Sequence, residues 1–145
     1  MSNVPSLYAA PIFPITLAGD VGSVVTTESC TSTTYVDLAT VGPSVTLTTG
    51  SRVLVIMSAA YAKTVNGGIG VVMGVVVSGA TTVAVPAGGY EASSDYSNSG
   101  FLYGLSRIFV LTGLTQGSNI FKLQYHITLG GTFTFRRRKL AVFVL

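Results

Sequence analysis

Residues 71–77 read VVMGVVV, a run that is apolar at odd and even positions alike. A β-strand with one face in water alternates apolar and polar residues, because successive side chains point to opposite faces. The run is too short for a membrane-spanning helix, and its β-branched residues and glycine favour a strand. The sequence therefore predicts a strand that is covered on both faces.

Turn signals divide much of the chain into similar segments. From Thr33 onward, clusters rich in Gly, Ser, Asn and Pro separate apolar stretches every 8–12 residues or so, and no stretch shows a helical period. The expected strands are 35–38, 44–48, 52–61, 69–77, 81–85, 101–112, 119–129 and 140–145. This pattern predicts an all-β fold over residues 31–145, an antiparallel two-sheet sandwich that is jelly-roll-like.

The segment 119–129 shows how this chain encodes a strand with one wet face. Its odd positions are apolar from Phe121 to Leu129, and its even positions are polar from Lys122 to Thr128. Four other segments lack this alternation: 53–57, 71–77, 108–111 and 140–145. A sandwich covers only one face of each sheet, so these strands need a second cover.

We expect that second cover to be another copy of the chain. Monomers rarely expose apolar patches beyond a few hundred Å², and about 1,000 Å² is worth roughly 25 kcal/mol before association costs. A homo-oligomer, as a closed ring or trimer, would bury such faces. The predicted oligomer interface comprises Val53, Val55, Val71, Val72, Val75, Val77, Phe109, Val142 and Phe143. In the alternative, loops and the proline-containing N-terminal segment cover these faces within one chain.

Residues 1–30 differ from the rest and predict an extended arm. Pro5, Pro11 and Pro14 fix φ and push the residues before them into extended conformations. The arm carries four large apolar residues that suit docking better than solvation: Leu7, Tyr8, Ile12 and Phe13. We expect this attachment arm to dock on its own body or on a neighbour; the alternative is a mobile terminus.

The excess of positive charge is local. The formal net charge is +3, and half of the eight basic residues lie in the run Arg136, Arg137, Arg138 and Lys139. The run predicts an anionic or inter-subunit contact, or a charged strand entrance that pairs with acids and limits edge pairing. It is too narrow for a nucleic-acid-binding face, so we expect no nucleic-acid partner.

The inventory of reactive residues argues against an enzyme. His126 has no acid near it in sequence, and Cys30 is the only cysteine. The five acids show no metal-ligand spacing, although Glu91 and Asp95 could bind a cation with loop carbonyls. No glycine-rich loop fits a nucleotide. We therefore predict a protein without catalytic residues, metal or cofactor.

Composition bears on location and partners. Charged residues make up 9% of the chain, against about 25% in average soluble proteins, which leaves little to hold copies apart. The N-terminus lacks the charged and apolar regions of a secretory signal, so we expect synthesis in a host cytoplasm and no membrane partner. The loop 86–103 is polar and aromatic, as in loops that bind sugars or proteins or form interfaces.

Several phrases resemble short structural proteins of tailed bacteriophages. They are CTSTTYVDLATVGPSVTLTTGSRVLVIMSAAY, VVVSGATTVAV, FVLTGLTQGSNIFKLQYHIT and FTFRRRKLAVFVL, within residues 30–145. The resemblance implies an oligomeric β-sandwich module of the virion, similar to jelly-roll or tumour-necrosis-factor-like folds, and it does not extend to the arm.

We therefore expect a non-enzymatic virion protein, a capsid decoration or head-fibre module that oligomerises through apolar sheet faces. Its partners would be copies of itself and other virion proteins such as the major capsid protein. The alternative is a tail-tip or receptor-binding module that binds host surface carbohydrate.

Overall fold

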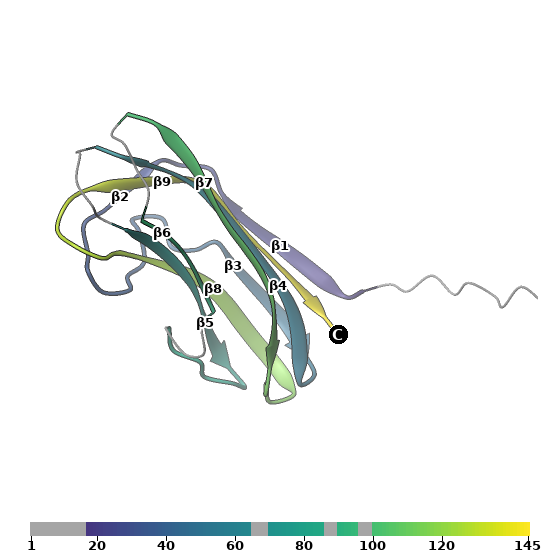
Figure 1. The fold of residues 1–145 in the computed structure, drawn as a ribbon. Helices are drawn as coiled ribbons and strands as arrows, with labels where there is room; N and C mark the ends of the chain where they lie inside the picture. Colours follow the sequence, from purple (N-terminus) through teal and green to yellow (C-terminus); the bar gives the residue numbers. More distant parts are fainter. Residues whose placement is uncertain (1–16, 65–69, 86–89, 96–99) are drawn as a thin grey trace, which may run out of the picture.

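The computed structural model describes residues 17–64, 70–85, 90–95 and 100–145 (Figure 1). In these residues nine strands and no helix form two antiparallel sheets that pack face to face, which confirms the predicted all-β sandwich. None of the described segments is a helix of the length and apolarity that crossing a bilayer requires. The strands are β1 (Gly19–Val24), β2 (Glu28–Cys30), β3 (Ser44–Thr49), β4 (Arg52–Lys63), β5 (Val71–Gly79), β6 (Glu91–Ser94), β7 (Leu102–Thr112), β8 (Gly117–Ile127) and β9 (Phe133–Val144).

The strand order is that of a jelly roll. The first sheet runs β1-β9-β4-β7, with β2 also paired to β9, and the second runs β3-β8-β5-β6. With β1 and β2 counted together, eight strands pass between two sheets in the double Greek-key pattern. β1 and β2 fall within the segment predicted to be an arm, so the sandwich takes in residues from Gly19 onward. The predicted strands 35–38 and 81–85 form only single bridges, Val36 to Tyr125 and Val83 to Val77.

Alternate residues of the two sheets fill the core. In β8 the odd positions from Phe121 to Ile127 are buried and the even positions between them are partly exposed, as the alternation predicts. In β4 the odd positions from Val53 to Lys63 are buried in the same way. Cys30 also lies in this core, at the end of β2.

A β-bulge in β9 reverses which side chains point inward. Ser58 of β4 pairs with Lys139, but Ala60 pairs with Arg136, so β9 has one residue more than β4 between these pairs. Arg137 takes the extra position with a φ of 52°, in the left-handed region. Before the bulge the odd positions Phe133 and Phe135 point into the core; after it the even positions, Leu140 among them, do so.

The bulge also turns Arg138 inward, where it binds the segment that leads from β2 toward β3. The Arg138 side chain is fully buried and its guanidinium lies 2.8 Å from the Glu28 carboxylate. It donates further hydrogen bonds to the carbonyl oxygens of Thr40 and Gly42, each 3.3 Å long. The predicted pairing of the basic run with acids thus holds for Arg138, within one chain. Arg138 is buried against its own chain and offers no anionic or inter-subunit contact.

We predict that Arg138→Gln destabilises the fold by about 3–5 kcal/mol, because it leaves Glu28 and two carbonyls without their charged partner. Lys139→Gln is the matched control, since Lys139 is exposed one position away, and it should change stability by no more than about 0.5 kcal/mol. Urea denaturation of both variants measures the difference. Equal losses would contradict the assigned role.

The Glu28 carboxylate gives this contact a pH dependence. Its burial acts to raise the pKa, but hydrogen bonds from Thr40 and Thr26 and the nearby Arg138 charge outweigh burial and hold the pKa below the ordinary 4.5. A carboxyl whose pKa is lower in the folded state stabilises the fold above its unfolded pKa and loses that contribution as pH falls through the folded value.

We therefore expect the stability difference between the wild type and Glu28→Gln to be complete at pH 7 and to shrink below about pH 4.5. Denaturation midpoints at pH 7 and pH 3 measure it. A difference that widens on acidification would show that the carboxylate is not the stabilising form.

Candidate assembly surfaces

Most residues predicted to form the oligomer interface lie inside the sandwich. The structure places six in the core of a single chain, each with at most 2% of its surface exposed: Val53, Val55, Val71, Val75, Val77 and Val142. Val72 is buried as well, on the other face of β5. These side chains have no surface to offer a second copy, so the prediction that they form the oligomer interface is wrong.

The error lies in the choice of face for β4 and β9. In β4 the outward set contains Leu54 and Ile56, but it also contains Arg52 and Ser58, whose polarity marks the wet side. In β9 the bulge changes the inward-facing residues from odd to even numbers, and the pattern of apolar residues does not reveal this change. In β4 the sandwich therefore buries the alternate residues that include Val53, and the alternate residues that include Leu54 face outward.

The chain itself covers the second face of β5. For this strand the alternative to a second copy, cover by segments of the same chain, is therefore the one observed. Tyr35, just before the bridge residue Val36, and Val85, just after the bridge residue Val83, lie over Gly74. A Cβ on Gly74 would lie 2.4 Å from a methyl carbon of Val85 and 3.1 Å from the Tyr35 ring. Glycine within VVMGVVV thus allows both covering segments to approach the strand closely.

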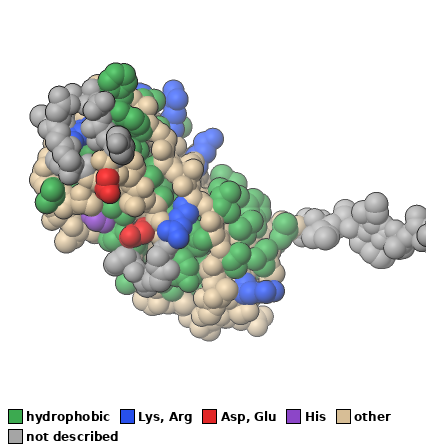
Figure 2. Space-filling view, viewed as in Figure 1, with side chains coloured by type: hydrophobic (Ala, Val, Ile, Leu, Met, Phe, Trp, Pro, Cys, Tyr) green, Lys and Arg blue, Asp and Glu red, His purple; other side chains and the backbone are tan. Residues whose placement is uncertain are grey.

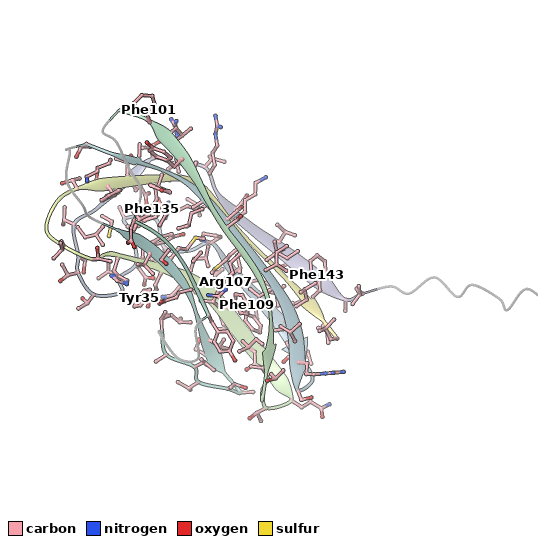
Figure 3. All side chains as sticks on the ribbon, in the orientation of Figure 1. Tyr35, Phe101, Arg107, Phe109, Phe135 and Phe143 are labelled. Carbon is pink, nitrogen blue, oxygen red and sulfur yellow. The ribbon has the colours of Figure 1, made fainter. Side chains whose placement is uncertain are left out.

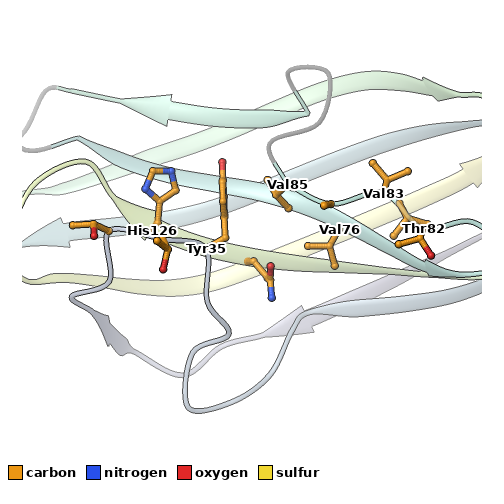
Figure 4. A pocket seen from close by; sticks show the side chains of 11 residues that line it. Tyr35, Val76, Thr82, Val83, Val85 and His126 are labelled. Atoms are coloured by element: carbon orange, nitrogen blue, oxygen red, sulfur yellow. The ribbon is translucent and has the colours of Figure 1, made fainter.

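Between these covering segments runs a groove, which we call the β5 groove (Figure 4). It encloses about 710 Å³ and is mostly apolar. Tyr35 and His126 lie at one end, and Thr82 and Val83 at the other. The rings of Tyr35 and His126 meet edge to face with centroids 4.4 Å apart, which places the predicted surface histidine in the groove wall. The Tyr35 hydroxyl donates to Glu91, and burial with this contact raises the pKa of Tyr35.

The first sheet carries an uncovered apolar surface on its outer side. Figure 2 shows hydrophobic side chains gathered there, with basic side chains above and below them. The outward positions of four adjacent strands supply this face patch: Val21, Leu54, Ile56, Ile108, Val110, Ala141 and Phe143. Ile108 is 66% exposed and Val21 is 59% exposed.

Strand register makes the face patch continuous. One row across the sheet runs Val21, Ala141, Ile56 and Ile108, each paired with the next. The neighbouring row starts at Gly19, whose missing side chain leaves room for the Phe143 ring, and continues through Leu54 and Val110. Figure 3 shows Phe143 on the outer side of the sheet and Phe135 between the sheets. Of the predicted interface residues, only Phe143 belongs to the face patch.

Charge is distributed unequally over the two sheets. None of the outward positions of β1, β9, β4 and β7 is Asp or Glu, whereas Arg52, Arg136 and Lys139 occupy three of them. On the outer side of the second sheet, Asp37 accepts a hydrogen bond from Lys122 at 2.7 Å. Of the basic run, Arg137 and Lys139 are exposed, Arg136 is partly exposed and Arg138 is buried.

The last residue of the predicted interface, Phe109, lies in β7, where the edge strands β6 and β7 of the two sheets face each other. Phe109 is partly buried and stacks on Tyr90 with ring centroids 5.1 Å apart. Arg107 donates to the Glu91 carbonyl oxygen, which ties β7 to β6 (Figure 3). In the loop 86–103, Phe101 is exposed and Tyr103 stacks on Tyr61, whereas Tyr96 lies outside the described residues.

The attachment-arm residues Leu7, Tyr8, Ile12 and Phe13 lie outside the described residues. The part of the chain that the structure describes contains no cluster of three or more His, Cys, Asp or Glu side chains that could hold a metal ion. Glu91, which with Asp95 could bind a cation by the sequence analysis, accepts a hydrogen bond from the Tyr35 hydroxyl. The described residues thus offer surfaces for association.

Comparison with known proteins identifies the fold. No protein-family model matches the chain, and no curated protein matches it. Among solved structures, the chain is similar to the infectious bursal disease virus Gt strain structure (TM-score 0.64, 14% identity, 97% of this chain and 38% of that one). It is also similar to the VP2 subviral particle of that virus (TM-score 0.63, 13% identity, 97% and 37%). The chain thus spans less than two fifths of these proteins, and the likeness is one of fold.

Proposed function

We propose that this chain is a structural protein of a virus particle and that it self-associates through the face patch. The observation that carries the proposal is the continuous apolar surface across four strands of the first sheet, which the described chain leaves uncovered. The similarity in fold to the infectious bursal disease virus structure and to the VP2 subviral particle supports a place in a virus particle. Exposed apolar patches rimmed by charge commonly mark protein interfaces.

The charges flanking the face patch favour one kind of assembly. A two-fold contact between two such faces would bring their basic residues together without acids, which costs free energy. Contact between the face patch of one copy and a different, acid-bearing surface of the next avoids this repulsion. Such heterologous contacts form rings when the rotation closes, and a trimer is the smallest ring.

We place the assembled protein on the outside of a tailed-bacteriophage head, as a decoration or head-fibre module. The exposed Arg137 and Lys139 would meet acidic residues of the major capsid protein. Synthesis in the host cytoplasm precedes this attachment.

Ile108→Asp should dissociate the assembly, because it puts a charge on the most exposed side chain of the face patch. We expect the dissociation constant to rise at least about 30-fold, equivalent to roughly 2 kcal/mol. Gln116→Asp is the matched control, since Gln116 is exposed in the turn between β7 and β8 and lies on neither sheet face. Sedimentation at micromolar concentration measures all three proteins. A monomeric wild type, or equal assembly of Ile108→Asp, would overturn the proposal.

The place in the particle is tested by immunogold labelling of virus particles purified from cells that make the chain. Regular label over the head is the expected result. Label confined to the tail would favour the alternative, a receptor-binding module, and binding of the assembled protein to a host glycan array would then test that alternative. Particles without label would exclude a virion protein.

A further inference from the structure

The β5 groove lies on the outer side of the second sheet, opposite the face patch, and its lining is mostly apolar. Val76 and Gln124 form its floor on adjacent strands, since Gly74, two residues before Val76, pairs with Gln124. The bridges of Val36 to Tyr125 and of Val83 to Val77 tie the two walls to the same sheet. Both walls are therefore fixed by backbone hydrogen bonds, which the docking of a chain segment requires (Figure 4).

The N-terminal segment matches this groove in composition. Residues 4–16 carry two apolar pairs, Leu7 with Tyr8 and Ile12 with Phe13, interrupted by prolines. Proline-containing segments favour the polyproline II conformation, which has no internal hydrogen bonds and docks into apolar grooves that contain aromatic residues. The segment has no charged residue to oppose burial.

The start of β1 determines which groove the segment can reach. The Ala18 carbonyl oxygen accepts a hydrogen bond from the Val144 amide at 2.8 Å, so the chain at Ala18 still follows β1 at the end of the sandwich where the C-terminus lies (Figure 1). The groove of the same chain lies over β5 and β8, on the outer side of the other sheet. To enter it, the N-terminal segment of the same chain would have to pass round β3, the edge strand of that sheet.

We propose that the β5 groove binds residues 4–16 of a second copy of this chain. A segment of this length spans up to roughly 45 Å when extended, which is enough to reach an adjacent copy. Each copy gives an arm to one neighbour and receives an arm from another, as in a ring of heterologous contacts. The inference rests on the proposed self-association and adds the arm as a second link between subunits.

Cysteine cross-linking tests the exchange. The only native cysteine, Cys30, is buried and does not interfere. Protein with Ile12→Cys and protein with Val83→Cys are refolded together and oxidised, and Thr46→Cys replaces Val83→Cys in the control. A disulfide-linked dimer from the first mixture, at least about tenfold more abundant than from the control, is the expected result.

The doubly substituted chain separates the possible occupants of the groove. Disulfide-linked oligomers are expected from Ile12→Cys combined with Val83→Cys. A disulfide within one chain, at the mass of a monomer, would show that the arm docks on its own body and would overturn the proposal. Where Val83→Cys does not fold, Ala84→Cys serves instead, because Ala84 lines the groove and is exposed.

Sedimentation of the wild type distinguishes failure of this inference from failure of the proposed function. An oligomer that dissociates with Ile108→Asp but gives no cross-link above the control would leave the face patch as interface and reject arm exchange. A monomer with no cross-link would reject both. Cross-linked dimers that persist in Ile108→Asp would show that the arm links copies independently of the face patch.

Discussion

The bulge at Arg137 is the constraint on which the rest of the structure depends. β9 pairs with β1, β2 and β4, so its side-chain parity decides what the first sheet buries. In an uninterrupted strand, a register that buries Phe135 would turn Leu140 outward, because the side-chain period is two. The extra residue places both in the core. It also turns Arg138 onto Glu28 and leaves Phe143 on the outer face, so the core, the buried ion pair and the face patch share one cause.

The sequence predicts strands well where burial alone decides them. The alternation in 119–129 identifies both β8 and its inward face, and the apolar run in 71–77 identifies a strand covered on both sides. β1 and β2 carry weaker signals. Their sequences GDVGSV and ESC contain few strand-forming residues, and pairing with β9 supplies what their own propensity lacks. Tertiary context therefore decides the N-terminal boundary of the sandwich.

The candidate surfaces are harder to predict, because apolarity at both parities identifies two apolar faces without telling which is inside. Arg52 and Ser58 give the answer for β4, and it requires only the polarity of the outward set. For β9 the inward face depends on the bulge at Arg137. This residue lies in a run of four basic residues, and such a run has no alternation of apolar and polar residues that would reveal the bulge. The cover over β5 depends on Tyr35, which lies far from that strand in sequence, and on Val85, in the segment that folds back directly after it. Such contacts are set by topology.

The two candidate surfaces lie on opposite sheets, and this placement limits how copies can associate. A two-fold dimer through the face patch would join basic flanks and leave both β5 grooves open. In a ring of heterologous contacts, each copy can instead use both surfaces. Its face patch contacts one neighbour, and its groove contacts that neighbour or the next one. Unless the rotation closes, that arrangement grows into a filament. A proline-containing arm that links copies as proposed would restrict the distance between neighbours. A closed ring needs such a restriction in addition to apolar burial, which is non-directional.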